Sequence, residues 1–289
     1  MEFSFRPIPS FSDSPIAAYL ELFHVSFPSA TKRFTADYLA WLYCENPSGV
    51  AVGFDAWDGE VLAAHYVCIP IAISLHGRRV QALLSLNTAT HPKYQGQGLF
   101  TKLAEHTYDY AAASGFSCVV GVANASSTPG FLRKLGFSLV APLTAKVGIG
   151  SFNTGWSANL AGVEFMRSWT AKDLSWRSSN PSGLVSYSAS LLGVFSCMAR
   201  SHIFGVTAYA EIPIGDFPMD FPSAGGFFSP LRVFIGSFPI SSFPSPAYMD
   251  IPSYLRPSPL NFIFKPLGVQ AIAPESGAVL LSFMDFDAY

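Results

Sequence analysis

The chain has 289 residues, of which 50% are apolar and only 12% are charged. Its 17 basic residues nearly balance its 19 acidic ones, so the sequence lacks the broad positive field that attracts nucleic acid phosphates. It also lacks an unbroken run of about 20 apolar residues, the length that crosses a bilayer. Neither a nucleic-acid partner nor a membrane span is expected.

The N-terminal residues and the cysteines indicate a cytoplasmic protein. Met1–Arg6 shows no basic start followed by an apolar segment and a cleavage site, so no secretory signal is predicted. The cysteines are widely spaced and form no CxxC pair, which favours buried free thiols over a disulfide framework or a zinc site. They are Cys44, Cys68, Cys118 and Cys197. No metal site is predicted.

The first half of the chain alternates helix and strand patterns. A short strand is predicted at Phe3–Arg6, and Ser14 with Pro15 opens the first helix. Thr35 caps a second helix, which stops at Asn46–Gly49. Turn signals then separate three strands, predicted at Val50–Phe54, Val61–Ile69 and Val80–Thr90.

The strongest helix pattern follows at Gly98–Ser114, which carries one apolar stripe and one charged face. Gly115 stands where a C-terminal cap is expected. The remaining elements of this half are a buried strand, a short helix and a returning strand, predicted at Phe116–Val122, Pro129–Leu135 and Ser138–Gly148. Helices packed on a mixed, mostly antiparallel central sheet define an α+β fold.

The second half is richer in Pro, Ser and Phe and contains mostly short strand patterns, the last at Val279–Phe286. There, Asp285 and Asp287 are expected to keep an edge strand soluble. This half also repeats part of the first. Thr35–Trp41, followed by an Asn-Pro-Ser-Gly stop, resembles Thr170–Trp176, which is followed by the same four residues. The repeat predicts a duplicated unit and two related domains, at 1–150 and 151–289. A chance match in a Ser- and Pro-rich chain is the alternative.

The segment that carries chemistry is Thr88–Leu103, where a strand meets a loop with two glycines and then an amphipathic helix. Glycines let the backbone approach a ligand, and the free N–H groups at a helix N-terminus favour an anion such as a pyrophosphate. A simple tight turn between strand and helix is the alternative. The spacing is not that of a P-loop, because GxxxxGK[ST] is absent.

The loop resembles the acyl-CoA motif of the GNAT family of N-acetyltransferases, Gln/Arg-x-x-Gly-x-Gly/Ala, with Gln95, Gly98 and Phe100 at its defining positions. Further along, Gly130–Phe137 resembles the family's second signature, a short helix that ends in Leu-Gly-Phe. Tyr38–Tyr43 with the following Asn-Pro-Ser-Gly is similar to a long, two-domain GNAT subgroup. The resemblance implies a GNAT acyl-CoA-binding domain at 1–150, followed by a degenerate GNAT-like domain at 151–289 without a Gly-rich loop.

The resemblance also implies acetyl-CoA, or another acyl-CoA, as the co-substrate. Backbone amides of the loop would bind its pyrophosphate, the end of the preceding strand would pair with the pantetheine arm, and Asn124 would hydrogen-bond a pantetheine amide. Splayed strands at Val80–Thr90 and Phe116–Val122 would leave a cleft for the thioester. The expected cofactor-binding residues are Thr88, Ala89, Thr90, Gln95, Gly96, Gln97, Gly98, Leu99, Phe100, Thr101, Asn124 and Phe131.

Two departures from the family pattern matter. Phe100 replaces a small residue, so the packing differs there or the ring points away from the phosphates. Leu132 stands where many members place a tyrosine that protonates the departing thiolate. Either a nearby hydroxyl replaces it, from Ser126, Ser127 or Thr128, or no acid is needed, because a thiol pKa of about 8.5 makes thiolate a tolerable leaving group.

A general base is harder to identify, because the strand Val80–Thr90 contains no acidic residue. Glu60 is expected to be a solvated turn residue, and His65 and Tyr66 are expected to face opposite sides of one strand. The remaining candidates are His91 or a chain of water molecules. His91 and Ser127 are therefore the candidate catalytic residues.

These features predict direct transfer of an acetyl group from acetyl-CoA to a primary amine of a small metabolite or amino sugar. No cysteine or serine stands beside a recognisable base, so no covalent enzyme intermediate is expected. Two alternatives stay open: a non-catalytic acyl-CoA sensor, and a longer-chain N-acyltransferase that makes N-acyl amino acids. The identity of the acceptor within this class is not predicted, and assembly as a homodimer is left open.

Overall fold

The computed structural model describes residues 2–9, 15–28, 34–152, 160, 162–183, 185–190, 194–201, 203–213, 229–240 and 244–286. Ser14 and Asp287 lie outside these residues. Among the described helices, none is long and apolar enough to cross a membrane.

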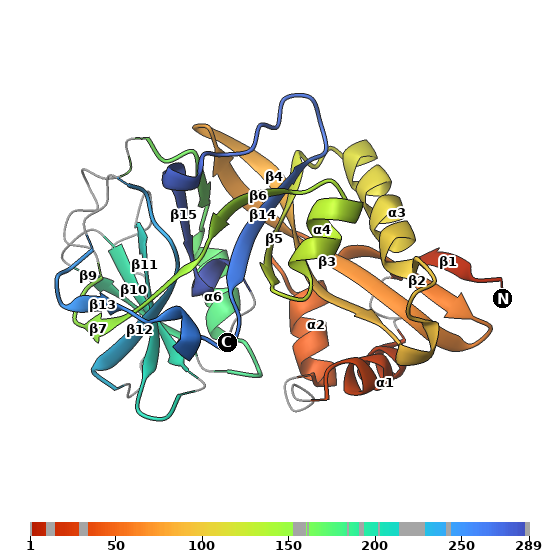
Figure 1. Cartoon of the computed structure of the whole chain (residues 1–289), viewed down its shortest axis with the longest axis horizontal. Coiled ribbons are helices and arrows are strands. Elements are labelled where there is room, and N and C mark those ends of the chain that lie inside the picture. Colours follow the sequence, from red (N-terminus) through yellow and green to blue (C-terminus); the bar gives the residue numbers. More distant parts are fainter. Residues whose placement is uncertain are drawn as a thin grey trace.

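The first half follows the predicted order of helices and strands (Figure 1). Its elements are β1 (Ser4–Pro7), α1 (Ile16–Ser26), α2 (Ala36–Cys44), β2 (Val52–Asp58), β3 (Val61–Leu75), β4 (Arg78–Thr90), α3 (Leu99–Ala113), β5 (Cys118–Asn124), α4 (Thr128–Lys134) and β6 (Ser138–Pro142). Helices α1 and α2 pack on one face of the sheet, and α3 and α4 pack on the other. The central strand β3 is buried almost throughout, because helices cover both of its faces.

The second half is mostly strand. After β7 (Thr144–Ile149), which still belongs to the first half, its elements are β8 (Phe165–Arg167), α6 (Ala171–Ser178), β9 (Val185–Ser190), β10 (Val194–Arg200), β11 (Thr207–Pro213), β12 (Leu231–Ser237), β13 (Tyr248–Asp250), β14 (Leu260–Pro266) and β15 (Val279–Ser282). In the described chain, the strand pairs are antiparallel except β4–β5, β8–β15 and β11–β12. The predicted mixed, mostly antiparallel α+β architecture is confirmed.

The two halves exchange strands. Strand β14, from late in the chain, lies between β5 and β6 of the first half, and β7 pairs with β12 and β13 of the second. The single strand predicted at Ser138–Gly148 is therefore wrong: it divides at Leu143, whose backbone N–H donates to Leu260 O between two separate pairings. The division at residue 150 stays a prediction.

The repeated sequence segments adopt the same local structure. Thr35 and Thr170 each accept a hydrogen bond on Oγ1 from the backbone N–H three residues later, and so cap α2 and α6. Asn46 and Asn180 each accept one on Oδ1 from the backbone N–H two residues later, which turns the chain after the helix. The shared caps and turns favour duplication over a chance match.

Candidate functional site

The Gly-rich loop presents open backbone to solvent at the N-terminus of α3. Gly96 and Gly98 have φ angles of 80° and 75°, and a Cβ on either would meet no atom within 4 Å. Gly98 is the N-cap residue and supplies no side-chain cap, so the N–H groups of the first turn have no acceptor among the residues that the structure describes. With the partial positive charge of a 15-residue helix behind them, these groups suit an anionic ligand.

The ring of Phe100 points away from this loop. Its centroid lies 5.4 Å from that of Phe131 in α4 and 5.9 Å from that of Tyr66 in β3. Gly130 makes room for it, because a Cβ there would lie 3.3 Å from Phe100 Cε1. The bulky residue in the loop pattern is thus accommodated by a glycine in the next helix, and the backbone of the loop stays accessible.

Strands β4 and β5 part beside the loop. Their parallel pairing runs from Ala82–Cys118 to Ser85–Gly121 and then stops, while β4 stays paired with β3 up to Thr90. The segment 86–88 is half-buried, which fits an edge without a strand partner. The divergence agrees with the splay expected between these strands.

A β-bulge lies in β4 where the strands part. The β3–β4 register shifts there, and Asn87 has a φ of 45°. Bulges often re-aim side chains next to functional sites. Asn87 was not predicted from the sequence, although asparagine is one of the few residue types that tolerate positive φ.

Asn124 and Ser127 organise the turn between β5 and α4. Asn124 Oδ1 accepts hydrogen bonds from the N–H groups of Ser126 and Ser127, at 3.0 and 2.9 Å. Ser127 Oγ in turn accepts from Asn124 N at 3.1 Å. Within the described chain, Asn124 Nδ2 makes no hydrogen bond, so this side-chain NH₂ group is available to donate to a ligand. The catalytic role expected of Ser127 stays a prediction.

His91 follows directly after β4 and is half-buried. Its Nδ1 accepts a hydrogen bond from Lys93 N at 3.2 Å, which caps the 3-10 turn Pro92–Tyr94. No hydrogen bond or ring contact joins His91 to Ser127 in the described structure. The role of His91 as a base likewise stays a prediction.

His65 and Tyr66 face opposite sides of β3, as expected. On the α3 side, Tyr66 Oη lies 2.6 Å from Tyr108 Oη and 3.0 Å from Ser85 Oγ. Burial raises the pKa of Tyr66 and of Tyr108 well above the usual value for tyrosine, so both hydroxyls stay protonated near neutral pH. They are potential proton donors where β4 and β5 begin to part.

On the opposite side, His65 belongs to a buried network of hydrogen-bonded polar side chains. Its Nδ1 lies 2.6 Å from Asp55 Oδ1, and its Nε2 lies 3.1 Å from Tyr43 Oη. Tyr19 donates to the other carboxylate oxygen of Asp55 at 2.7 Å. Asn87 Nδ2, in the bulge, donates to Tyr43 Oη at 3.4 Å. Their proximity was not predicted from the sequence, because these residues come from five separate elements.

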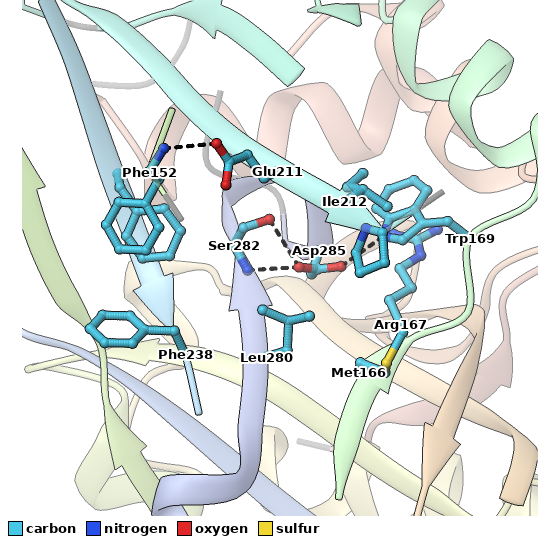
Figure 2. Close-up of a pocket in the computed structure, with 12 residues that line it drawn as sticks. Phe152, Met166, Arg167, Trp169, Glu211, Ile212, Phe238, Leu280, Ser282 and Asp285 are labelled. Carbon is cyan, nitrogen blue, oxygen red and sulfur yellow. Dashed lines mark hydrogen bonds between the residues drawn. The ribbon is translucent and has the colours of Figure 1, made fainter. Parts of the chain in front are cut away.

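A second polar cluster lies in the other half of the chain, around a cavity of about 20 Å³ (Figure 2). Asp285 is buried there and accepts hydrogen bonds from the N–H and hydroxyl of Ser282. Burial raises its pKa above the usual value, although Arg167 opposes this, and burial lowers the pKa of Arg167 to about 10. The strand predicted to run to Phe286 is wrong in its last residues. It ends at Ser282, because Ser282 and Asp285 cap a 3-10 turn that begins there. The cavity has room for about one water molecule and not for a cofactor.

Residues 8–140 match the model of the acetyltransferase (GNAT) domain family. No curated protein matches the sequence significantly. The chain is similar in structure to a protein of unknown function from Enterococcus faecalis V583, described as a probable N-acyltransferase. The TM-score is 0.60 at 11% identity, over 94% of this chain and 74% of that one.

Two further solved structures resemble most of the chain. A GCN5-related N-acetyltransferase from Anabaena variabilis matches with a TM-score of 0.59 at 11% identity, covering 93% of this chain and 74% of the other. Eis1 from Mycobacterium abscessus matches with a TM-score of 0.54 at 10% identity, covering 93% and 75%. At such low identity the likeness shows the fold alone. The GNAT fold expected from the sequence is confirmed.

Proposed function

Because residues 8–140 are a GNAT acetyltransferase domain, we propose that this protein transfers an acetyl group from acetyl-CoA to a primary amine of a small metabolite or amino sugar. The observation that carries the proposal is the open backbone from Gly96 to the first turn of α3. Its N–H groups would bind the pyrophosphate of CoA without needing lysines. A nearly neutral chain is therefore no obstacle to binding a highly charged co-substrate.

The parting of β4 and β5 supports a place for the pantetheine arm and the thioester. Beyond Ser85, the edge of β4 that faces β5 has no strand partner in the described chain, so its peptide groups, including those of Thr88–Thr90, are open to an extended ligand. Asn124 Nδ2 is available at the end of β5 to hydrogen-bond a pantetheine carbonyl. The acyl group would then lie beside the β4 bulge at Asn87.

The states of the cysteines favour direct attack by the amine over a covalent enzyme intermediate. Burial raises the pKa of Cys68 and of Cys118 to about 12, so neither is a thiolate near neutral pH. Both thiols are fully buried in the two strands that flank β4. The amine would therefore attack the thioester carbon itself, and the CoA thiolate would depart.

The test combines a binding titration with an assay of thiol release. Isothermal titration with acetyl-CoA and with CoA measures binding, and release of free CoA is followed across a panel of primary amines and amino sugars. Saturable binding with amine-dependent release supports the proposal. Binding without release from any amine would instead indicate an acyl-CoA sensor, and a preference for long-chain acyl-CoA would indicate an N-acyl amino acid synthase. Failure to bind any acyl-CoA would overturn the site assignment.

A further inference from the structure

We propose that Tyr43, His65 and Asp55 form a proton relay that deprotonates the acceptor amine, and that Asn87 holds the amine at its open end. This inference rests on the proposed function and supplies the base that the sequence did not reveal. The relay lies on the α1 and α2 side of β3 and β4, and reaches the β4 bulge where β5 diverges.

The hydrogen bonds fix the direction of the relay. An ionised Asp55 can only accept, so His65 donates to it from Nδ1–H across 2.6 Å. In the neutral imidazole Nε2 is then the acceptor, and Tyr43 Oη–H donates to it across 3.1 Å. The Asn87 amide donates to Tyr43 Oη across 3.4 Å. The arrangement matches a hydroxyl–imidazole–carboxylate triad, with tyrosine in the place of the nucleophile.

Burial assigns different roles to the members. His65 and Asp55 are 0% and 1% exposed, so they cannot touch a substrate and act as positioning residues. The titratable groups that face His65 are Asp55 from β2, Tyr19 from α1 and Tyr43 from α2. Asn87 is half-buried, and its Oδ1 makes no hydrogen bond within the described chain, which leaves it able to accept one from an amine N–H.

The cost of burying these groups argues for a function. A carboxylate and an imidazole in the apolar core beside Phe23 lose their hydration, and such pairs are often less stable than apolar replacements. The structure limits this cost by giving both oxygens of Asp55 a hydrogen-bond donor, from His65 and Tyr19. That is the arrangement expected where an imidazolium must form briefly and be stabilised.

An alkylammonium acceptor loses two protons during the reaction. The first passes to Tyr43 Oη while the tyrosine proton passes to His65 Nε2, so the imidazolium is held by Asp55. The neutral nitrogen then attacks the thioester carbon, a C–N bond forms, the C–S bond breaks, and the second proton of the nitrogen passes to the departing thiolate. The imidazolium returns its proton through Tyr43 to solvent. An alkylammonium and an acyl-CoA thus give an amide, CoA and one proton, with no other reactant.

The experiment compares Tyr43→Phe with Tyr209→Phe in the full-length protein. Each removes one buried hydroxyl that hydrogen-bonds inside the protein, but Tyr209 Oη donates to Glu211 Oε1 at 2.8 Å, away from the relay, whereas Tyr43 lies between His65 and the bulge. Acetyl-CoA binding and thermal unfolding are measured for both variants, and thiol release is measured with a primary alkylamine, which is protonated at neutral pH, and with an arylamine, which is not.

We expect Tyr43→Phe to lower kcat for the alkylamine by roughly 10²–10⁴-fold, the usual contribution of general base catalysis, with KM and acetyl-CoA affinity nearly unchanged. The arylamine needs no protein base, so its kcat falls far less. Tyr209→Phe keeps kcat close to that of the wild type. Equal losses for both amines, or for both variants, would show a structural role and overturn the relay alone. A wild-type protein that binds acetyl-CoA but acylates no amine of the panel would overturn the proposed transferase function itself.

Discussion

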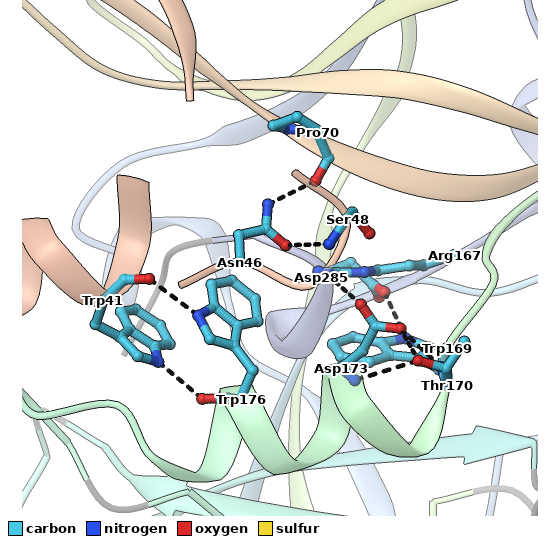
Figure 3. Close-up of polar contacts among 10 residues, drawn as sticks. All are labelled: Trp41, Asn46, Ser48, Pro70, Arg167, Trp169, Thr170, Asp173, Trp176 and Asp285. Carbon is cyan, nitrogen blue, oxygen red and sulfur yellow. Dashed lines mark hydrogen bonds and ion pairs between the residues drawn. The ribbon is translucent and has the colours of Figure 1, made fainter. Parts of the chain in front are cut away.

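Trp41 and Trp176 exchange hydrogen bonds across the junction of the two halves of the chain. Trp41 Nε1 donates to the backbone carbonyl of Trp176 at 2.8 Å, and Trp176 Nε1 donates to that of Trp41 at 3.0 Å (Figure 3). The rings stack with centroids 4.6 Å apart and an interplanar angle of 15°. These residues occupy equivalent positions in the repeated segments, so α2 and α6 meet with local two-fold symmetry.

Replacing either tryptophan with phenylalanine should destabilise the protein by about 1–3 kcal/mol, because each change leaves one buried carbonyl without its donor. The two residues are in direct contact, so the double variant should cost less than the sum of the single variants. Urea unfolding of the wild type and the three variants completes the cycle. Strictly additive effects would contradict the reciprocal pairing.

The repeated segment also shows what the sequence could reveal about the fold. The Thr caps and the Asn turns depend on residues two or three positions apart, so local patterns were sufficient to predict them. The strand exchange was not predictable in this way. Strand β14 pairs with β5 although more than a hundred residues separate them in the sequence. The residue pattern of a short apolar segment such as Leu260–Pro266 does not indicate which strand it pairs with.

A similar limit applied to the candidate site. The Gly-rich loop was predicted because its chemistry depends on backbone and on local spacing, and the structure places its two glycines at the N-terminus of α3. The hydrogen-bonded network around His65 was not predicted, since its members come from separate helices and strands. A histidine in an apolar strand pattern gives no sign of its partners until the fold brings Asp55 and Tyr43 to it.

Gly98→Leu should weaken acetyl-CoA binding by at least about tenfold, a loss of about 1.4 kcal/mol. The new side chain would enter the open space that the ligand is proposed to occupy, and the positive φ would add backbone strain of about 1–2 kcal/mol. Gly115→Leu is the matched control. Gly115 has a φ of 85° and equally open surroundings, but it lies beyond the opposite end of α3. Calorimetric titration should show normal affinity for the control, and equal affinity in both variants would remove the loop from the site.

Phe100→Ala should lower stability without affecting acetyl-CoA affinity. The ring packs against Phe131 in α4 and Tyr66 in β3, so its removal leaves a cavity in the cluster between α3 and α4. The expected cost is about 2–4 kcal/mol, below the upper end for a phenylalanine because the ring is only partly buried. Thermal unfolding measures the cost and calorimetry the affinity. A large loss of affinity in a folded variant would show that the ring contacts the ligand.

The native protein should react slowly with thiol reagents, and the rate should rise with pH. Cys68, Cys118 and Cys197 are fully buried, so only the half-buried Cys44 is accessible. Burial, with a smaller contribution from Glu45, raises the pKa of Cys44 to about 11. An ordinary thiol with a pKa of about 8.5 is roughly one-quarter ionised at pH 8, so Cys44 should have a thiolate fraction, and a reaction rate, about two orders of magnitude lower.

Because the pH stays below the pKa of Cys44 throughout this range, its modification rate should increase about tenfold per pH unit between pH 7 and pH 9. The rate of a free thiol levels off near pH 9, because that thiol approaches full ionisation. Reaction with a chromogenic disulfide reagent measures the rate, and Cys44→Ser should abolish it in the native state. In denaturant all four thiols become reactive, which supplies the full amplitude for comparison. Rapid modification of a native thiol at pH 7 would mean that one cysteine lies in an electropositive, accessible environment. Such a cysteine would be a candidate nucleophile for a covalent acyl-enzyme intermediate, against the proposed direct attack.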